Sequence, residues 1–258
     1  VETVRDGVTI DDIAKRANVS KSTVSRVLNG SAVVNQQKQD AVHQAVIDLD
    51  YTPNMFAQGL ASGKSMTLGI LTQNIGSPFY AAIAQGVIEG LAGSGYTPLF
   101  VDGGWDHERE AVAIEALISR KVDGLLIVGG VIAASELQFY EKQMPLIVVA
   151  RDINGLERRC VSVNNKQIGY MATKHLLEQR HTQIAFIHGI EGHPDAQDRF
   201  AGHLEALQEA GISRSDELIY QGDFSGHAGL KAVNYLLDQG ISFSAIVAAN
   251  DMVALGSR

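Results

Sequence analysis

The alternation of short apolar runs with amphipathic stretches after Met66 is the feature that most constrains how this chain folds. Each apolar run is followed by turn residues, which is typical of a buried strand. The runs form two series, at residues 67–74, 97–103, 124–130 and 146–151, and at residues 160–165, 183–189, 217–222 and 245–250. Strands that alternate with helices at this spacing predict parallel sheets. We therefore predict an α/β core of two doubly wound parallel-sheet subdomains, at residues 67–160 and 161–258, with a ligand crevice between them.

The segment before this core has no strand pattern and predicts three short helices. Thr9 and Asp12 have the spacing of a capping box that begins the first helix. Ser20 is a favourable N-cap for a second helix over residues 21–28, and Asn35 is one for a third helix over residues 36–49. Residues 1–52 are therefore expected to form a small all-α domain, and residues 53–66 to connect it to the core.

Charge is distributed unevenly along the chain. The formal net charge is −8, which by itself argues against nucleic acid because phosphate binding requires a basic surface. Between Ile13 and Gln39, however, there is no acidic residue, and the basic residues there are Lys15, Arg16, Lys21, Arg26 and Lys38. We therefore expect a basic N-terminal unit on an acidic body, with nucleic acid as a candidate partner of that unit.

The compartment is indicated by the single cysteine and by the apolar segments. Cys160 cannot form an internal disulfide, and a lone cysteine is typical of a reducing compartment. The N-terminus lacks the pattern of a secretory signal, and the longest apolar stretch, residues 125–134, is too short to span a bilayer. We therefore expect a cytoplasmic protein with no membrane partner.

The first two predicted helices are joined by the short turn Asn18–Ser20 and form a candidate helix-turn-helix. Such a unit needs small or apolar residues that hold the two helices together, and a second helix with polar side chains for the major groove. The first set is Ala14, Val19, Val24 and Val27, and the second set is Lys21, Ser22, Ser25 and Arg26. The alternative is a three-helix packing unit whose charged face is only solvated.

Two segments carry a resemblance to a known family. DDIAKRANVSKSTVSRVLNG, at residues 11–30, and YTPNMFAQGLASGKSMTLGI, at residues 51–70, resemble the N-terminus of the lactose/galactose repressor (LacI/GalR) family in order and in spacing. The strand and helix series after residue 66 resembles the sugar-binding, periplasmic-binding-protein-like core of that family. The resemblance implies a cytoplasmic repressor that binds a near-palindromic double-stranded operator as a homodimer, under the control of a small-molecule effector, a sugar or sugar derivative.

The resemblance also assigns DNA contacts to individual residues. It implies that Lys21, Ser22 and Arg26 contact base edges, and that Thr23, Ser25 and Asn29 contact phosphates. Residues 54–61 resemble the family's hinge helix, with Asn54, Ala57 and Leu60 at the DNA, and Leu60 as the side chain that wedges open a central base step. Lys38 and Gln39 depart from the family where the third helix begins, so the backbone contacts are expected to differ there.

Candidate effector residues follow from the predicted sheets, because ligands of open α/β sheets bind beyond the carboxyl ends of the strands. Aromatic faces for stacking on a sugar are available from Phe79, Tyr80, Trp105 and Phe224, and groups that can bridge hydroxyls from Arg151, Arg199, Asn250 and Asp251. Arg199, Phe224, Asn250 and Asp251 also lie in segments that resemble effector-binding segments of the family. The departure is Ala150–Arg151, where some members have an acidic sugar ligand.

Other chemistry is not indicated. His181, His188 and His193 have no metal-ligand spacing, and no cysteine or carboxylate cluster joins them. No catalytic signature is found, so we predict no catalytic residue, no metal and no cofactor. Two alternatives stay open: a periplasmic-type sugar-binding protein without a regulatory role, and an α/β enzyme acting on a sugar or nucleotide. The chain ends soon after a helix begins, at Asp251, so we expect the second subdomain to be incomplete.

Overall fold

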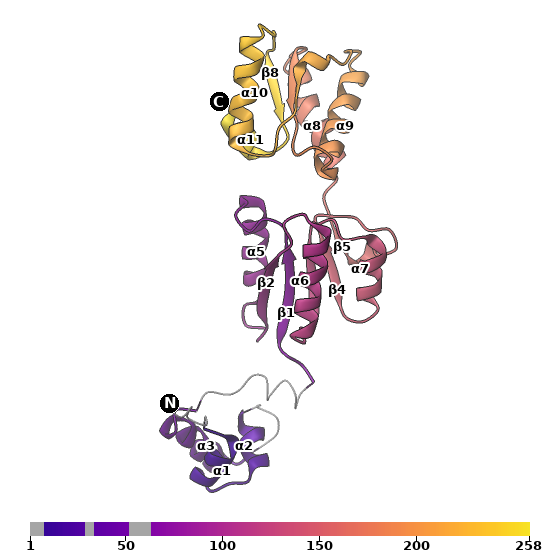
Figure 1. Cartoon of the computed structure of the whole chain (residues 1–258). Helices are drawn as coiled ribbons and strands as arrows, with labels where there is room; N and C mark the ends of the chain where they lie inside the picture. Colours follow the sequence, from indigo (N-terminus) through magenta and orange to yellow (C-terminus); the bar gives the residue numbers. More distant parts are fainter. Residues whose placement is uncertain (1–7, 29–33, 52–62) are drawn as a thin grey trace, which may run out of the picture. The chain divides into compact units, whose positions relative to one another are not determined.

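The structure is a computed structural model that describes residues 8–28, 34–51 and 63–258 (Figure 1). Four predicted DNA contacts, at Asn29, Asn54, Ala57 and Leu60, lie outside these ranges, as does the predicted hinge helix. The chain divides into two compact units, one of residues 1–149 and 153–159 and the other of residues 150–152 and 160–258.

The N-terminal segment of the first unit contains the three predicted helices: α1 (Ile10–Arg16), α2 (Lys21–Leu28) and α3 (Gln36–Asp48). The capping box of α1 is present, with the Thr9 amide donating to the Asp12 carboxylate at 3.0 Å. The Ser20 hydroxyl accepts from the Thr23 amide at 3.2 Å, and the Asn35 side chain from the Gln37 amide at 2.8 Å. The three predicted N-caps are therefore confirmed, and they satisfy amides that a helix start leaves without partners.

One apolar cluster holds the three helices together. Ile13 of α1, Val24 of α2 and Val42 of α3 are each completely buried in it. The four residues predicted to join the first two helices, Ala14, Val19, Val24 and Val27, all belong to this cluster. Because Val24 faces the cluster, the polar residues on the other side of α2 face solvent.

The remainder of the first unit is a parallel sheet with helical connections. Its strands are β1 (Thr67–Thr72), β2 (Thr97–Asp102), β3 (Gly124–Val128) and β4 (Leu146–Val149), and its helices are α5 (Pro78–Leu91), α6 (His107–Ser119) and α7 (Ala134–Glu141). β1 pairs in parallel with β2 and β3, and β3 with β4. The connection from β1 leads to β2 on one side of it, and the connection from β2 crosses back past β1 to β3 on the other side. Since such crossovers are right-handed, the helices cover both faces.

The structure corrects the prediction for residues 160–165. This run was expected to be the first strand of the second subdomain, but only β5 (Cys160–Val161) is a strand, and it is the edge strand of the first sheet, in the order β2-β1-β3-β4-β5. Val161 and Val163 are more than half exposed, so the run is not buried on both faces as a central strand would be. A 3-10 turn (Glu157–Arg159) precedes it.

The second unit contains a smaller parallel sheet in the order β7-β6-β8. Its strands are β6 (Ile184–Ile187), β7 (Ile219–Tyr220) and β8 (Ala245–Ala248), and its helices are α8 (Asn165–Glu178), α9 (Pro194–Glu209), α10 (Gly226–Asp238) and α11 (Asp251–Gly256), with a 3-10 turn at Asp216–Leu218. The two α/β sheets predicted from the sequence are thus present. β6 is the central strand, and its four residues are buried.

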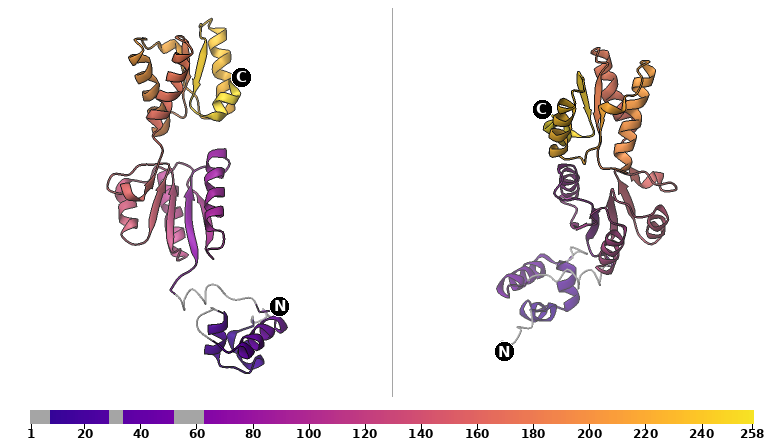
Figure 2. Two further views of the ribbon diagram at one scale, coloured as in Figure 1. Left: turned by 180° about the vertical axis from the view of Figure 1, so that it is seen from behind. Right: turned by 45° about the horizontal axis from the view of Figure 1, so that its top comes forward.

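Glycines let α8 and α9 pack with their backbones in contact; the two helices, salmon and orange, lie side by side in Figures 1 and 2. A Cβ atom on Gly169 would lie 1.8 Å from the carbonyl oxygen of Arg199, and one on Gly202 would lie 1.9 Å from that of Lys166. No side chain fits at either position, so the two glycines fix where the helices cross. This places the start of α9, with Arg199, against the start of α8.

A buried histidine lies in this helix contact. His203 of α9 is 2% exposed, and its Nδ1 atom is 2.9 Å from the Thr173 hydroxyl of α8. The same hydroxyl donates to the carbonyl oxygen of Gly169 at 2.9 Å, so Nδ1 of His203 is the donor in the first bond. Burial lowers the pKa of His203 to about 4, which keeps the ring neutral near pH 7.

The lowered pKa of His203 makes stability depend on pH. An unfolded histidine has a pKa of about 6.5, so between that value and about 4 the unfolded chain binds a proton that the folded chain does not. The free energy of unfolding should therefore fall as the pH drops through this range, by on the order of 3 kcal/mol. His203→Gln should remove that part of the pH dependence in urea unfolding at pH 7 and pH 5. His175→Gln, an exposed histidine on α8, is the control, and equal pH dependence in both variants would contradict this account.

Candidate nucleic-acid interface and ligand-binding loops

The exposed face of α2 carries the side chains predicted to contact base edges. Lys21, Ser22 and Arg26 are exposed, and Thr23 and Ser25 are half-buried beside them. The Ser20 hydroxyl lies 2.9 Å from the hydroxyls of both Ser22 and Thr23, so hydrogen bonds hold these groups together at the start of the helix. No acidic residue occupies the first turn of α2, which leaves the positive end of the helix dipole available to a phosphate.

Lys21 also contacts the first helix. Its ammonium nitrogen lies 2.5 Å from Oδ1 of Asp11, with the two side chains 69% and 43% exposed. Asp11 is not among the residues predicted for the interface. Arg16 of α1 forms a further ion pair with Asp48 at the end of α3.

In the first unit, an aromatic cluster lies where β1 and β2 end. Phe79 is half-exposed, whereas the neighbouring Tyr80 is only 9% exposed. The Tyr80 ring meets the Phe79 ring edge to face at 5.1 Å and the Trp105 ring at 6.2 Å. The structure therefore brings three of the predicted aromatic residues together, with Phe79 as the one that presents a face to solvent.

The carboxyl ends of β1 and β3 are adjacent, at the point where the strand order reverses, which is where open α/β sheets bind ligands. Gln73 follows β1 and Gly129 follows β3; a Cβ atom on Gly129 would lie 3.1 Å from the Tyr80 hydroxyl oxygen and 3.3 Å from the Trp105 ring. Gln73 is 2% exposed and accepts from the Trp105 amide at 2.8 Å, while its Nε2 has no hydrogen-bond partner within the described ranges. Gln73 was missed from the sequence, where a strand-end glutamine carries no distinctive signal.

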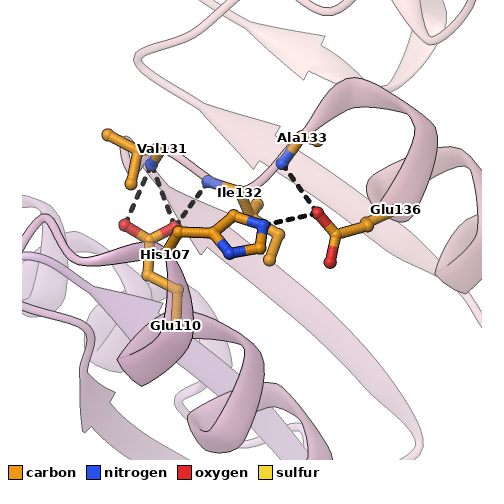
Figure 3. A network of polar contacts seen from close by, with 6 residues as sticks. All are labelled: His107, Glu110, Val131, Ile132, Ala133 and Glu136. Atoms are coloured by element: carbon orange, nitrogen blue, oxygen red, sulfur yellow. Dashed lines mark hydrogen bonds and ion pairs between the residues drawn. The ribbon is translucent and has the colours of Figure 1, made fainter.

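A carboxylate buried under the loop after β3 was also missed. Glu110 of α6 is completely buried; its two oxygens accept from the Val131 amide at 2.9 Å, and one accepts from the Ile132 amide at 2.8 Å (Figure 3). These bonds fix the backbone of this loop to α6. Its only sequence signal is a glutamate on the apolar face of a predicted helix.

A second link joins α6 to the start of α7. Glu136 Oε2 accepts from the Ala133 amide at 3.2 Å and lies 2.7 Å from His107 Nε2 (Figure 3). The hydrogen bond with Glu136 and the charge of its carboxylate raise the pKa of His107, and the bond with His107 lowers the pKa of Glu136. Two carboxylates thus hold the last three residues of the loop after β3, just before α7.

In the second unit, three of the predicted effector residues converge at the end of β8. Arg199 of α9 donates from Nε to the Asn165 side chain at 2.9 Å and from Nη1 to the carbonyl oxygen of Ala249 at 2.5 Å. The next residue, Asn250, donates to the carbonyl oxygen of Phe224 at 3.0 Å and caps α11 by accepting from the Val253 amide at 2.9 Å. Asp251 is exposed at the start of α11.

Phe224 is held by its backbone and by the loop after β6. Its φ of 68° is uncommon outside glycine. Its ring lies over Gly189, where a Cβ atom would be 2.1 Å from the ring, and it meets the His193 ring edge to face at 5.1 Å. Burial lowers the pKa of His193 and raises the pKa of Asp195 two residues on. From the sequence, His193 was considered only as a metal ligand and rejected as one, yet it lies against a candidate effector residue.

Arg151 is half-buried and follows Ala150, whose φ is 60°. Its role in effector binding stays a prediction. Within the described part of the chain no group of three or more His, Cys, Asp and Glu residues is suited to a metal ion. No helix among the described residues is long and apolar enough to cross a membrane.

A helix-turn-helix ahead of two α/β units with strand-end loops defines a DNA-binding regulator with a periplasmic-binding-protein-like core. Residues 9–54 match the family described as bacterial regulatory proteins, lacI family, and residues 65–258 match the periplasmic binding proteins and sugar binding domain of LacI family. The chain belongs to the LacI family.

Individual relatives agree with this assignment. The chain is 34% identical over 250 residues to the HTH-type transcriptional regulator GalR of Escherichia coli (strain K12), which covers 96% of this chain and 73% of GalR. It is 30% identical over 251 residues to the catabolite control protein A of Priestia megaterium, covering 96% and 76%. The lac repressor dimer bound to operator and the anti-inducer ONPF matches with a TM-score of 0.86 and 25% identity, covering 98% and 76%. The chain is thus a DNA-binding transcriptional regulator and not an enzyme.

The loop after β3 provides a test of the Glu110 contact. Glu110→Gln replaces one acceptor oxygen with an NH2 group that faces backbone donors, so it should lower the free energy of unfolding by about 1–3 kcal/mol. Urea unfolding measures this, with Glu108→Gln, an exposed glutamate on the same helix, as the control. Equal stability of the two variants would show that Glu110 does not fix this loop.

Proposed function

We propose that this regulator is a cytoplasmic repressor that binds a near-palindromic operator as a homodimer and that a sugar or sugar derivative controls its operator affinity. The observation that carries the DNA-binding part is the division of α2 into a buried face at Val24 and an exposed face with Lys21, Ser22 and Arg26. Such a helix can enter the major groove without exposing its own core. In this proposal residues 1–52 bind DNA, residues 53–66 connect, and the α/β core binds the effector.

Each group on α2 has a distinct part in the proposed interface. Arg26 is exposed in the last turn, and its guanidinium can donate two hydrogen bonds to guanine. Thr23, Ser25 and Asn29 are proposed to contact phosphates and so to fix the register on the duplex. Asn54, Ala57 and Leu60 are proposed to contact the minor groove, with Leu60 as the wedge at the centre of the operator.

The effector is proposed to bind at the strand ends of the α/β core. The planar guanidinium group of Arg199 and the planar amide group of Asn250 can hydrogen-bond to sugar hydroxyls. Phe224 supplies an apolar face for a sugar ring. Phe79, Tyr80, Arg151 and Asp251 complete the proposed set. The support for this set is that Arg199, Asn250 and Phe224 are connected through the end of β8 although they come from three different segments.

Control of DNA affinity follows from linkage. An effector that binds one conformation of the regulator better than another shifts the population toward it, by no more than its difference in affinity. Whether the effector acts as an inducer or a co-repressor depends on which conformation also binds the operator.

The base-contacting role of Arg26 can be measured directly. Arg26→Ala should weaken binding to an operator selected from a random duplex library by about 1–3 kcal/mol and relax the preference at one base pair in each half-site. Fluorescence anisotropy at fixed salt measures both the selected and the random DNA. An equal loss on the two DNAs would assign Arg26 to phosphates instead.

The effector site is tested by a substitution that keeps the charge. Arg199→Lys loses the planar fork that reaches both Ala249 and Asn165, so the response of operator binding to the effective sugar should be lost. A panel of sugars and sugar phosphates, titrated against the protein–operator complex, identifies the effector first. Arg180→Lys, at the amino end of β6 and so at the opposite sheet edge from these loops, is the control. A full sugar response in Arg199→Lys, with operator affinity unchanged, would exclude Arg199 from the site.

A further inference from the structure

We propose that Asp11 is a specificity-determining residue of the DNA interface, and that Asp11 and Lys21 together recognise one G·C base pair in each half-site. The Lys21 ammonium donates to the guanine, and the Asp11 carboxylate accepts from the amino group of the paired cytosine. This inference rests on the proposed function of α2 and adds to it a residue from α1.

The geometry of the two side chains supports the pairing. Asp11 is in the first turn of α1 and Lys21 is the first residue of α2, so the turn between these helices brings two helix starts together. The ammonium nitrogen lies 2.5 Å from Oδ1 of Asp11. That oxygen is covered within the protein, so the acceptor offered to the cytosine is the other carboxylate oxygen, Oδ2. In a G·C pair the guanine O6 atom and the cytosine N4 atom are themselves hydrogen-bonded, about 2.9 Å apart. Because the two oxygens of one carboxylate lie close together, the protein presents a donor beside an acceptor, as the base pair presents an acceptor beside a donor.

Asp11 does not cap α1, whereas its neighbour Asp12 does. Asp12 completes the capping box with Thr9. The carboxylate of Asp11 instead contacts Lys21, and both side chains keep substantial exposure. Exposed ion pairs of this kind contribute little to folding. The pair therefore has a position and an exposure suited to a partner molecule.

The charges of Asp11 and Lys21 explain why this ion pair affects the choice of DNA sequence more than the overall affinity for DNA. A lysine paired with a carboxylate adds little to the attraction of DNA phosphates, and a carboxylate near the groove is repelled by them. This weaker attraction is offset only where the bases offer hydrogen-bond partners to both the ammonium and the carboxylate. Guanine offers the two acceptors N7 and O6, and the adjoining cytosine offers the N4 amino group for a carboxylate. Asp11 thus penalises sites without this arrangement.

The test is selection of binding sites from a random duplex library with the full chain and three variants. The wild type and Asp40→Ala should enrich G·C at one position in each half-site, and Asp11→Ala and Lys21→Ala should lose that preference. Asp40 is an exposed carboxylate of the same domain that accepts from Gln36 at 3.0 Å, so its variant controls for the change in charge. Circular dichroism of each variant checks that the helices are intact.

Salt dependence supplies an independent measurement. In Asp11→Ala the freed Lys21 can contact a phosphate, so the salt slope of binding to random DNA should steepen by about 0.9. Affinity for that DNA should also rise more than it does in Asp40→Ala. If Lys21→Ala keeps every base preference, the assignment of Lys21 to base contacts fails, and this inference fails with it. If Lys21→Ala loses a preference that Asp11→Ala keeps, only the role of Asp11 is overturned.

Discussion

Burial of the central strands is the interaction on which the rest of the α/β core depends. Ile70, Leu71 and Ile127 in the first sheet, and Phe186 and Ile187 in the second, are almost completely buried. Strands covered on both faces pair in parallel and are connected through helices, so successive strands point the same way. All the loops that follow the strands must then gather at one edge of their sheet. The candidate effector residues are at that edge because of this geometry, and not because they are close in sequence.

The loops are held by polar contacts to neighbouring helices rather than by their own sequence. Glu110 fixes the loop after β3 through the amides of Val131 and Ile132, and Arg199 fixes the end of β8 through the carbonyl oxygen of Ala249. Each contact joins a helix to a strand end within one unit. Residues that position a loop and residues that would touch a ligand are thus neighbours, and Arg199 is proposed to do both. This arrangement preorganises the donors and acceptors before any ligand is present, which lowers the ordering cost of binding.

Individual residues show how much of the fold and of the candidate sites can be predicted from the sequence. The three N-caps, the apolar contacts of Val24 and the alternation of strands with helices were all predicted correctly, because each depends on residues near one another in the chain. The run at residues 160–165 was assigned to the wrong sheet, because an apolar pattern identifies a strand without identifying its partner. Gln73, Glu110 and His193 were missed, and so was the contact of Asp11 with Lys21. Their contacts depend on which segments meet in space.

The family, the helix-turn-helix and the α/β class of the core can all be recognised in the amino-acid sequence. Local patterns carry this information, because hydrophobic period and capping act over a few residues. Three contacts are visible only in the folded protein. Glu110 is buried under the loop after β3, Phe224 lies over Gly189, and Asp11 lies against the residue that begins α2. The physical reason is that the charge and hydrogen-bonding role of a side chain depend on its partner, and a partner distant in the sequence is chosen by the packing of the whole unit.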